Sequence, residues 1–444
     1  MPVTDDAYAT PPEILLARRE RVLERLGGGV LVLCSAPELL KSRDTDVRFR
    51  QDSDLFYLTG FMEPGAVAVL TPHDPERRLT LFVRPRDPER ETWTGRREGV
   101  EGARERFAAD AAYPVEELDQ HLRALLEPAD EVVYAFGTHP EMDQRILRLV
   151  TGFRRTRPRA GKGPLAVRDP DAVLAEMRLV KEPWELERMR RAGEISARGH
   201  LAALRAARPG IGEWELEAVL DAAFRSAGGR GSSYPTIVGS GANATVLHYV
   251  ANDRRARDGE LVLVDAGAEW GMYAGDITRT FPVSGRFTEA QRAVYEVVLA
   301  AEEAAIAAVR PGALFSDVHE AAVRVLTRGM VDLGLLTGDV DELIESEGYK
   351  PFYMHQTSHW LGLDVHDVGP YRRGGEWVRF EPGMVLTIEP GLYIAEDADV
   401  PEAFRGIGVR IEDDVAVTAD GHEILTRGVP VAADEIERLV GSGG

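Results

Sequence analysis

The sequence has almost no cysteine, no long apolar run and no secretory signature. Its single cysteine, Cys34, cannot form an internal disulfide, and its apolar neighbours favour a buried thiol in a strand. No stretch approaches the ~18 continuous apolar residues of a membrane span. The first residues, Met-Pro-Val-Thr-Asp-Asp, lack the basic region and apolar run of a secretory signal. We therefore expect no membrane association and a cytoplasmic protein.

Positive charge is also scarce. Lysine and arginine number 53 against 74 aspartates and glutamates, which gives a formal net charge of −21. A nucleic-acid partner is not expected, because a protein of this charge offers no basic stripe to replace phosphate counterions. The chain has 444 residues, of which 44% are hydrophobic. That length is more than one hydrophobic core usually fills, so two domains are expected.

The first third of the chain alternates between helical and strand-like patterns. Apolar residues at helical spacing end at three consecutive glycines, residues 27–29, and short apolar runs follow. Helices and strands in alternation are typical of an α/β domain. We predict helices at 12–26, 115–126 and 142–153, and strands at 30–33, 66–70, 79–83 and 131–136.

Residues 154–170 are basic and rich in proline and glycine, which favours a domain boundary near their end. We predict an N-terminal α/β domain at 1–172 and a second domain at 173–444. In the second domain the predicted helices are 183–207, 213–227, 289–309 and 315–333. The remainder is mostly strands and turns, so this domain is predicted to be α+β with a curved antiparallel sheet.

Five residues of the second domain carry the functional signal. Four are carboxylates in or beside apolar, strand-like runs, and the fifth is a histidine. Burying four carboxylates together requires compensating positive charge, which two divalent cations would supply. We therefore predict a dinuclear metal site with the ligands Asp265, Asp276, His359, Glu389 and Glu412.

The two aspartates lie in one predicted hairpin. A turn centred on Trp270 and Gly271 would place Asp265 directly opposite Asp276. Like charges at opposed positions destabilise a sheet, which favours a cation between them. A bulge would shift this register.

Two further patterns bear on the metal and its surroundings. Arg410 lies two residues before Glu412 and faces the same side, where it could brace a ligand or bind a substrate carboxylate or carbonyl. His355 and His359 are four residues apart, but no glutamate follows the first, so the zincin helix motif is absent. One imidazole with four carboxylates favours Mn²⁺ and allows Fe²⁺, Co²⁺ or Zn²⁺.

The order Asp, Asp, His, Glu, Glu resembles the pita-bread metallopeptidases, the family of methionine aminopeptidase, aminopeptidase P and prolidase. All five positions carry the family's residue type. Three local strings resemble its Xaa-Pro branch, and residues 42–60 resemble the N-terminal domain of bacterial aminopeptidase P. The strings are His359-Trp-Leu-Gly-Leu-Asp-Val-His366-Asp, Thr387-Ile-Glu-Pro-Gly-Leu-Tyr393 and Arg410-Ile-Glu-Asp-Asp.

The resemblance implies a role for each residue. Asp265 would bind one metal, Asp276 and Glu412 would bridge both, and His359 and Glu389 would complete the other. A metal-bridging hydroxide would attack the carbonyl group before proline, with Glu389 as proton acceptor. His248 and His366 resemble histidines that assist the tetrahedral intermediate and proton transfer. His355, Tyr393 and Arg410 resemble residues of a proline pocket.

The expected activity is therefore release of the N-terminal residue from peptides with proline in the second position. A dipeptidase of the prolidase type would use the same ligands, and the N-terminal domain favours the aminopeptidase. A more remote alternative is a non-catalytic peptide-binding protein on the same fold. The resemblance also implies a homodimer or homotetramer.

Overall fold

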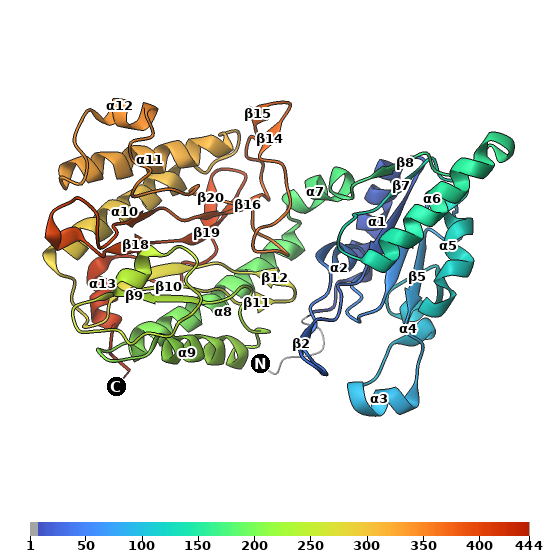
Figure 1. Ribbon diagram of the computed structural model, residues 1–444, viewed down its shortest axis with the longest axis horizontal. Helices are drawn as coiled ribbons and strands as arrows, with labels where there is room; N and C mark the ends of the chain where they lie inside the picture. Colours follow the sequence, from blue (N-terminus) through green and yellow to red (C-terminus); the bar gives the residue numbers. More distant parts are fainter. Residues whose placement is uncertain (1–7, 444) are drawn as a thin grey trace. The chain divides into compact units, whose positions relative to one another are not determined.

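The computed structural model describes residues 8–443 and consists of two compact units (Figure 1). The division falls between Met177 and Arg178. Helix α7 (Asp171–Leu179) runs across this position and across the boundary that we predict between residues 172 and 173. Each unit has hydrophobic clusters of its own, and each is described separately.

The N-terminal unit is built on a six-stranded mixed sheet with the strand order β6-β5-β4-β1-β7-β8. Strand β1 pairs antiparallel with β4 and parallel with β7. Its sequence, Gly-Val-Leu-Val-Leu-Cys, is buried along its whole length, as expected for a strand covered on both faces. The strands are β1 (Gly29–Cys34), β4 (Val67–Leu70), β5 (Leu79–Val83), β6 (Ala111–Pro114), β7 (Glu131–Val133) and β8 (Ala166–Arg168).

Helices pack on this sheet through apolar side chains at helical spacing. Val30, Val32 and Cys34 point to the face that is covered by α5 and α6. The predicted helix at 142–153 is longer than expected, because its last turns continue through Pro158. The remaining elements are α1 (Pro12–Leu26), β2 (Leu40–Ser42), β3 (Thr45–Asp46), α2 (Ser53–Thr59), α3 (Pro88–Thr94), α4 (Gly99–Glu105), η2 (Val115–Glu117), α5 (Leu118–Leu126) and α6 (Pro140–Ala160).

The second unit places short antiparallel sheets between two pairs of helices. In β10 (Leu261–Asp265), Leu261 and Leu263 pack toward α10 and α11, whereas Val262 and Val264 pack toward α8 and α9. Figure 1 shows α8 and α9 below these strands and α10 and α11 above them. The helices are α8 (Pro183–Ala206), α9 (Glu213–Ser226), α10 (Glu289–Ala308), α11 (Phe315–Asp332), α12 (Val340–Glu345) and α13 (Ala433–Leu439).

The sheets of this unit are β9-β10-β13, β16-β19-β20, β17-β18, β11-β12 and β14-β15. A bridge between Thr278 and Glu412 links the first group to the segment between β18 and β19. The strands are β9 (Ile237–Ser240), β10 (Leu261–Asp265), β11 (Glu269–Trp270), β12 (Tyr273–Ala274), β13 (Thr278–Pro282), β14 (Arg372–Arg373), β15 (Glu376–Trp377), β16 (Val385–Ile388), β17 (Gly391–Tyr393), β18 (Gly408–Arg410), β19 (Asp413–Val417) and β20 (His422–Ile424), with short helices η3 (Gly241–Thr245) and η4 (Glu402–Phe404).

The predicted register of the aspartate hairpin is wrong. Asp265 lies opposite Thr278, and Asp276 is two residues away from the opposed position. The turn residues are Gly271 and Met272, both with positive φ, so the turn is centred one residue later than predicted. Two successive residues with positive φ match the right-handed twist of a hairpin. Methionine rarely adopts positive φ, and the sequence therefore gives no signal for this turn.

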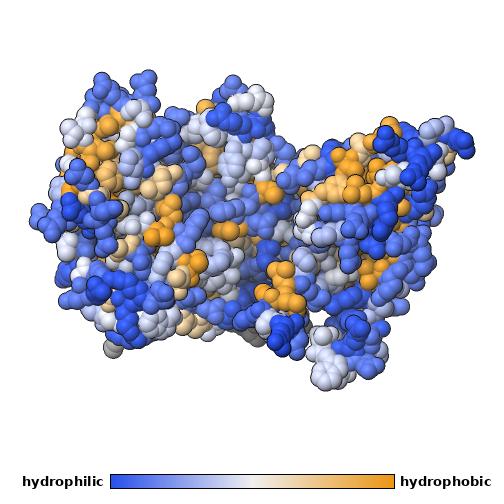
Figure 2. Space-filling view, viewed as in Figure 1, coloured by the Kyte–Doolittle hydropathy of each residue, from blue (hydrophilic) through white to orange (hydrophobic). Residues whose placement is uncertain are grey.

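The predicted helix bounds of the second unit are close to the observed ones, and the predicted α+β class is confirmed. Among residues 8–443, no helix is long and apolar enough to cross a membrane. Figure 2 shows a largely hydrophilic surface on the face in view, with apolar side chains in separate small patches.

Candidate metal centre

Four of the five predicted ligands lie at the ends of strands or directly beside them, and His359 lies in an irregular segment. Asp265 is the last residue of β10, and Asp276 lies between β12 and β13. Glu389 directly follows β16, and Glu412 separates β18 from β19. All five, including His359, line one cavity of about 270 Å³. Residues separated by up to 147 positions are therefore brought together in one place.

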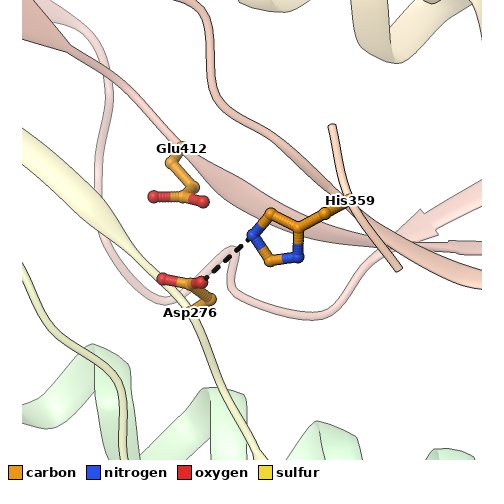
Figure 3. A group of neighbouring side chains, drawn as sticks. All are labelled: Asp276, His359 and Glu412. Carbon is orange, nitrogen blue, oxygen red and sulfur yellow. Dashed lines mark ion pairs between the residues drawn. The ribbon is translucent and has the colours of Figure 1, made fainter. Parts of the chain in front are cut away.

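Three of these side chains are close enough to share one ion. Ligand atoms of Asp276, His359 and Glu412 all lie within 4.8 Å of one another (Figure 3). Nε2 of His359 is 3.7 Å from Oδ2 of Asp276 and 3.6 Å from Oε1 of Glu389. Nδ1 of His359 donates to the carbonyl oxygen of Trp360 at 3.0 Å. That bond leaves the lone pair of Nε2 facing the carboxylates, as a metal-binding imidazole requires.

The pKa shifts in the centre indicate that its buried carboxylates lack compensating positive charge. Burial, followed by the charges of neighbouring carboxylates, raises the pKa of Asp276 and of Glu412 well above their usual values. Burial also raises the pKa of Glu389 to about 8. Burial lowers the pKa of His359 to about 4, which keeps its imidazole neutral. Oxygen donors that resist ionisation, beside a neutral imidazole, suit divalent cations, because cations stabilise ionised carboxylates.

Several neighbours that were not predicted from the sequence form hydrogen bonds with the predicted ligands. The hydroxyl group of Tyr234 is 2.6 Å from Oδ1 of Asp265 and also contacts the Asp276 carboxylate. Thr278 donates to Oε2 of Glu412 at 2.6 Å. The backbone N–H of Asp276 donates to Oδ2 of Asp414 at 3.0 Å.

The signals for these neighbours differ in strength. Thr278 follows Asp276 by two residues, and Asp414 follows Glu412 by two, so strand alternation could have suggested both. Tyr234 precedes Asp265 by 31 residues in an irregular segment, and nothing in the sequence pattern points to it.

Arg410 is in the centre, as its spacing from Glu412 suggested. Its guanidinium is buried, and Nη2 lies 2.6 Å from Oδ2 of Asp265. Nε donates to Oγ1 of Thr278 at 3.1 Å. One buried guanidinium beside four carboxylates still leaves an excess of negative charge, which divalent cations would neutralise.

His355, Tyr393 and Arg410 form one chain of contacts. Nη1 of Arg410 donates to the Tyr393 hydroxyl oxygen at 3.1 Å, and that hydroxyl lies 2.8 Å from Nε2 of His355. Nδ1 of His355 donates to the carbonyl oxygen of Gln356, so Nε2 accepts from Tyr393. Burial, then Arg410, lowers the pKa of His355 to about 4, consistent with this neutral tautomer. None of the three is among the residues that line the cavity, although Arg410 contacts Asp265.

The two other predicted histidines lie at the edge of the centre. His248 and His366 both line the cavity, and both are exposed. The ring of His366 packs edge-on against the ring of His359, with centroids 4.4 Å apart. Both imidazoles can therefore reach a molecule bound in the cavity.

Two family models match the chain. Residues 187–419 match metallopeptidase family M24, and residues 16–134 match the aminopeptidase P N-terminal domain. Among curated proteins, the chain is 46% identical over 425 residues to the Xaa-Pro aminopeptidase of Escherichia coli, covering 95% of this chain and 96% of the relative. It is 35% identical to human Xaa-Pro aminopeptidase 3, covering 92% of this chain and 80% of the relative.

Solved structures give the same picture. Aminopeptidase PepP of Pseudomonas aeruginosa superposes with a TM-score of 0.94 at 47% identity, covering 98% of both chains. Zinc-substituted Escherichia coli aminopeptidase P in complex with product superposes with a TM-score of 0.93 at 45% identity, covering 97% of this chain and 98% of the other.

Proposed function

Because this chain belongs to metallopeptidase family M24, we propose that it releases the N-terminal residue from peptides that have proline in the second position. The family resemblance identified from the sequence is confirmed. So is the fold class, an α/β N-terminal domain with an α+β pita-bread catalytic domain, and so is the assignment as a metal-dependent hydrolase that acts on peptide N-termini. We propose the specificity for proline on the basis of the relatives, which are named Xaa-Pro aminopeptidases.

The observation that supports this proposal most strongly is the convergence of five metal-type donors on one cavity. Divalent metal ions are the cofactors, and we propose that the five predicted ligands hold two of them. We further propose Mn²⁺, since four carboxylates and one imidazole form an oxygen-rich set. When bound, the ions supply Lewis acidity, which polarises the peptide carbonyl group and lowers the pKa of water.

The residues of the chain have distinct roles in this proposal. Glu389 is the proton acceptor, since its carboxylate lies in the cavity, 3.6 Å from Nε2 of His359. His248 and His366 donate hydrogen bonds to the substrate and to the developing oxyanion from the edge of the cavity. His355, Tyr393 and Arg410 support the proline pocket, because they form one hydrogen-bonded chain beside Asp265 and Glu389, directly behind the lining of the cavity.

A series of substrates of increasing length tests the specificity. Purified protein loaded with Mn²⁺ should release the first residue from Xaa-Pro-Yaa and from longer peptides. Matched peptides with alanine in place of proline should be cleaved at least about tenfold more slowly, since the proline pocket contributes differential transition-state binding. Cleavage of Xaa-Pro dipeptides alone would establish the prolidase alternative instead.

Metal analysis tests the cofactor and the non-catalytic alternative together. We expect about two divalent ions for each chain and an activity that chelation removes and Mn²⁺ restores. Protein without bound metal, and without activity after Mn²⁺ addition, would favour a peptide-binding protein on the same fold. Higher activity with Co²⁺, Zn²⁺ or Fe²⁺ at matched occupancy would contradict the choice of Mn²⁺.

Assembly and location complete the proposal. Peptides are the substrates, and we propose that the protein acts in the cytoplasm as a homodimer or homotetramer. Sedimentation of the purified protein over a range of concentrations tests the assembly, and fractionation of the cells tests the location.

A further inference from the structure

The segment that carries His248 connects β9 to β10 and has little regular structure. Only η3 interrupts it among residues 241–260, and His248 lies after η3 between Val246 and Val250. Both valines are about half exposed, at 51% and 53%. Leu247 and Tyr249, the direct neighbours of His248, are partly buried against the core, so their packing and the polar contacts of this segment together define where the imidazole lies.

Glu213 provides contacts on both sides of His248. This carboxylate is in the first turn of α9 and is only 1% exposed. Its Oε1 accepts from the backbone N–H and the hydroxyl group of Ser240, both at 2.7 Å, and from Nδ2 of Asn243 at 3.2 Å. Its Oε2 accepts from the hydroxyl group of Tyr249 and from the backbone N–H of Arg254, both at 2.9 Å, and the Tyr249 hydroxyl is also 2.9 Å from Oδ1 of Asp253.

These five hydrogen bonds need an acceptor on both oxygens. An ionised carboxylate accepts on both, whereas the amide of glutamine would turn an N–H toward one group of donors. Three of the donor groups, on Ser240 and Asn243, precede His248 in the sequence, and two, on its direct neighbour Tyr249 and on Arg254, follow it. A buried carboxylate that receives this many bonds fixes the geometry of the groups that donate to it.

Close packing limits where the rest of this segment can lie. A Cβ atom on Gly239 would be 2.8 Å from the carbonyl oxygen of Asn243, so η3 folds tightly back on β9. A Cβ atom on Gly408 would be 2.1 Å from the carbonyl oxygen of Ala244, so η3 also lies against β18. The segment therefore lies between β9 and β18, and Glu213 accepts hydrogen bonds from residues on both sides of His248.

We propose that Glu213 is the positioning residue for His248, holding the segment from Ser240 to Arg254 so that the imidazole meets the substrate. The inference rests on the proposed function, in which His248 acts on the bound peptide. Glu213 itself touches neither the cavity lining nor any of the five proposed ligands in the contacts described above. It acts through backbone and side-chain groups on both sides of the histidine.

A double-mutant cycle tests this role. The variants are Glu213→Gln, His248→Ala and the double variant, assayed with an Xaa-Pro-Yaa peptide in the metal-loaded, full-length protein. Glu215→Gln is the matched control, since it removes one charge from the same turn of α9 at a partly exposed position. Metal content and melting temperature are measured for every variant. Tyr249→Phe, which removes a single donor, is the second variant if Glu213→Gln fails to fold.

The cycle separates positioning from general stability. Glu213→Gln should lower kcat by about 100-fold with little change in KM, because a small displacement of a catalytic group has an effect of this size. The same substitution in the His248→Ala background should cost less than about threefold, with metal content unchanged. Tyr249→Phe should follow the same pattern with a loss of about tenfold, and Glu215→Gln should match the wild type.

Other outcomes overturn the inference in distinguishable ways. An equal loss in both backgrounds, or a loss that follows metal content or melting temperature, would mean that Glu213 only supports the fold. Wild-type activity in Glu213→Gln, with His248→Ala impaired, would refute the positioning role and leave the proposed function intact. Wild-type activity in His248→Ala would refute both the inference and the proposed role of His248.

Discussion

Removing the metal ions should reverse the way in which the stability of the catalytic unit depends on pH. Without metal, burial raises the pKa of Glu389 from an ordinary 4.5 to about 8. Between these two values the folded protein holds a proton that the unfolded chain has released. The free energy of unfolding therefore falls as pH rises, by about 1.4 kcal/mol for each pH unit and each such group. Asp276 and Glu412 shift in the same direction.

The size of the fall in the free energy of unfolding follows from the interval between the two pKa values of Glu389. Glu389 alone contributes a decrease on the order of 5 kcal/mol between pH 4.5 and 8. In a protein of this size, such a change corresponds to a melting temperature lower by roughly 10 °C. With metal bound, the carboxylates are ionised in the folded state, and metal binding strengthens as protons leave. The metal-loaded protein should therefore gain stability over the same range of pH.

Thermal unfolding from pH 5 to pH 8, with chelator and with Mn²⁺, measures both slopes. Glu389→Gln is the matched control, because it keeps the shape of the side chain and removes the ionisable group. Its chelated form should lose stability less steeply than the chelated wild type, by about 1.4 kcal/mol for each pH unit. The reasoning is refuted if the chelated wild type gains stability with rising pH, or if its profile coincides with that of the variant.

Three substitutions test other parts of the centre. Arg410→Ala leaves the Asp265 carboxylate without its buried guanidinium and should lower the free energy of unfolding in urea by about 3–5 kcal/mol. A loss below about 1 kcal/mol would mean that this ion pair contributes little to the stability of the fold. Tyr234→Phe removes the hydroxyl group beside the same carboxylate and should weaken metal binding about 10–100-fold by calorimetry, with an unchanged affinity counting against a role in holding the ligands. Gly267→Ala would place a Cβ atom 1.6 Å from a backbone carbonyl oxygen of the same hairpin and should cost more than about 3 kcal/mol, whereas Gly421→Ala, with nothing within 4 Å, should be within about 0.5 kcal/mol of the wild type.

Local sequence patterns predicted the regular elements well because their causes are local. Helix α8 begins at Pro183 and ends before Arg208-Pro209-Gly210, as a proline in the first turn and a breaker at the end predict. Strand β5 was predicted at its observed bounds, Leu79–Val83, from five apolar or β-branched residues. Extensions such as the last turns of α6 were missed, because a proline inside a helix normally predicts its end.

The centre could be predicted only where its residues carry a chemical signature in the sequence. Carboxylates beside buried strands stand out, and four of the five proposed ligands were predicted in this way, while their roles remain predictions. The hairpin register was wrong because it depends on a turn with positive φ at Met272. Tyr234 and Glu213 were missed because their partners lie between 27 and 42 residues away, through loops whose course no local pattern specifies.

The positions of the buried carboxylates of the centre imply that metal binding and folding are coupled in the catalytic unit and not in the N-terminal unit. The three carboxylates of the centre with raised pKa, Asp276, Glu389 and Glu412, belong to the catalytic unit, and their mutual repulsion is relieved when cations bind. The N-terminal unit has a separate apolar cluster, formed by β1, α5 and α6, that contains none of these carboxylates. A ligand stabilises only the structure whose folding creates its site. Chelation should therefore lower the unfolding transition of the catalytic unit, and Glu389→Gln should reduce that effect only there.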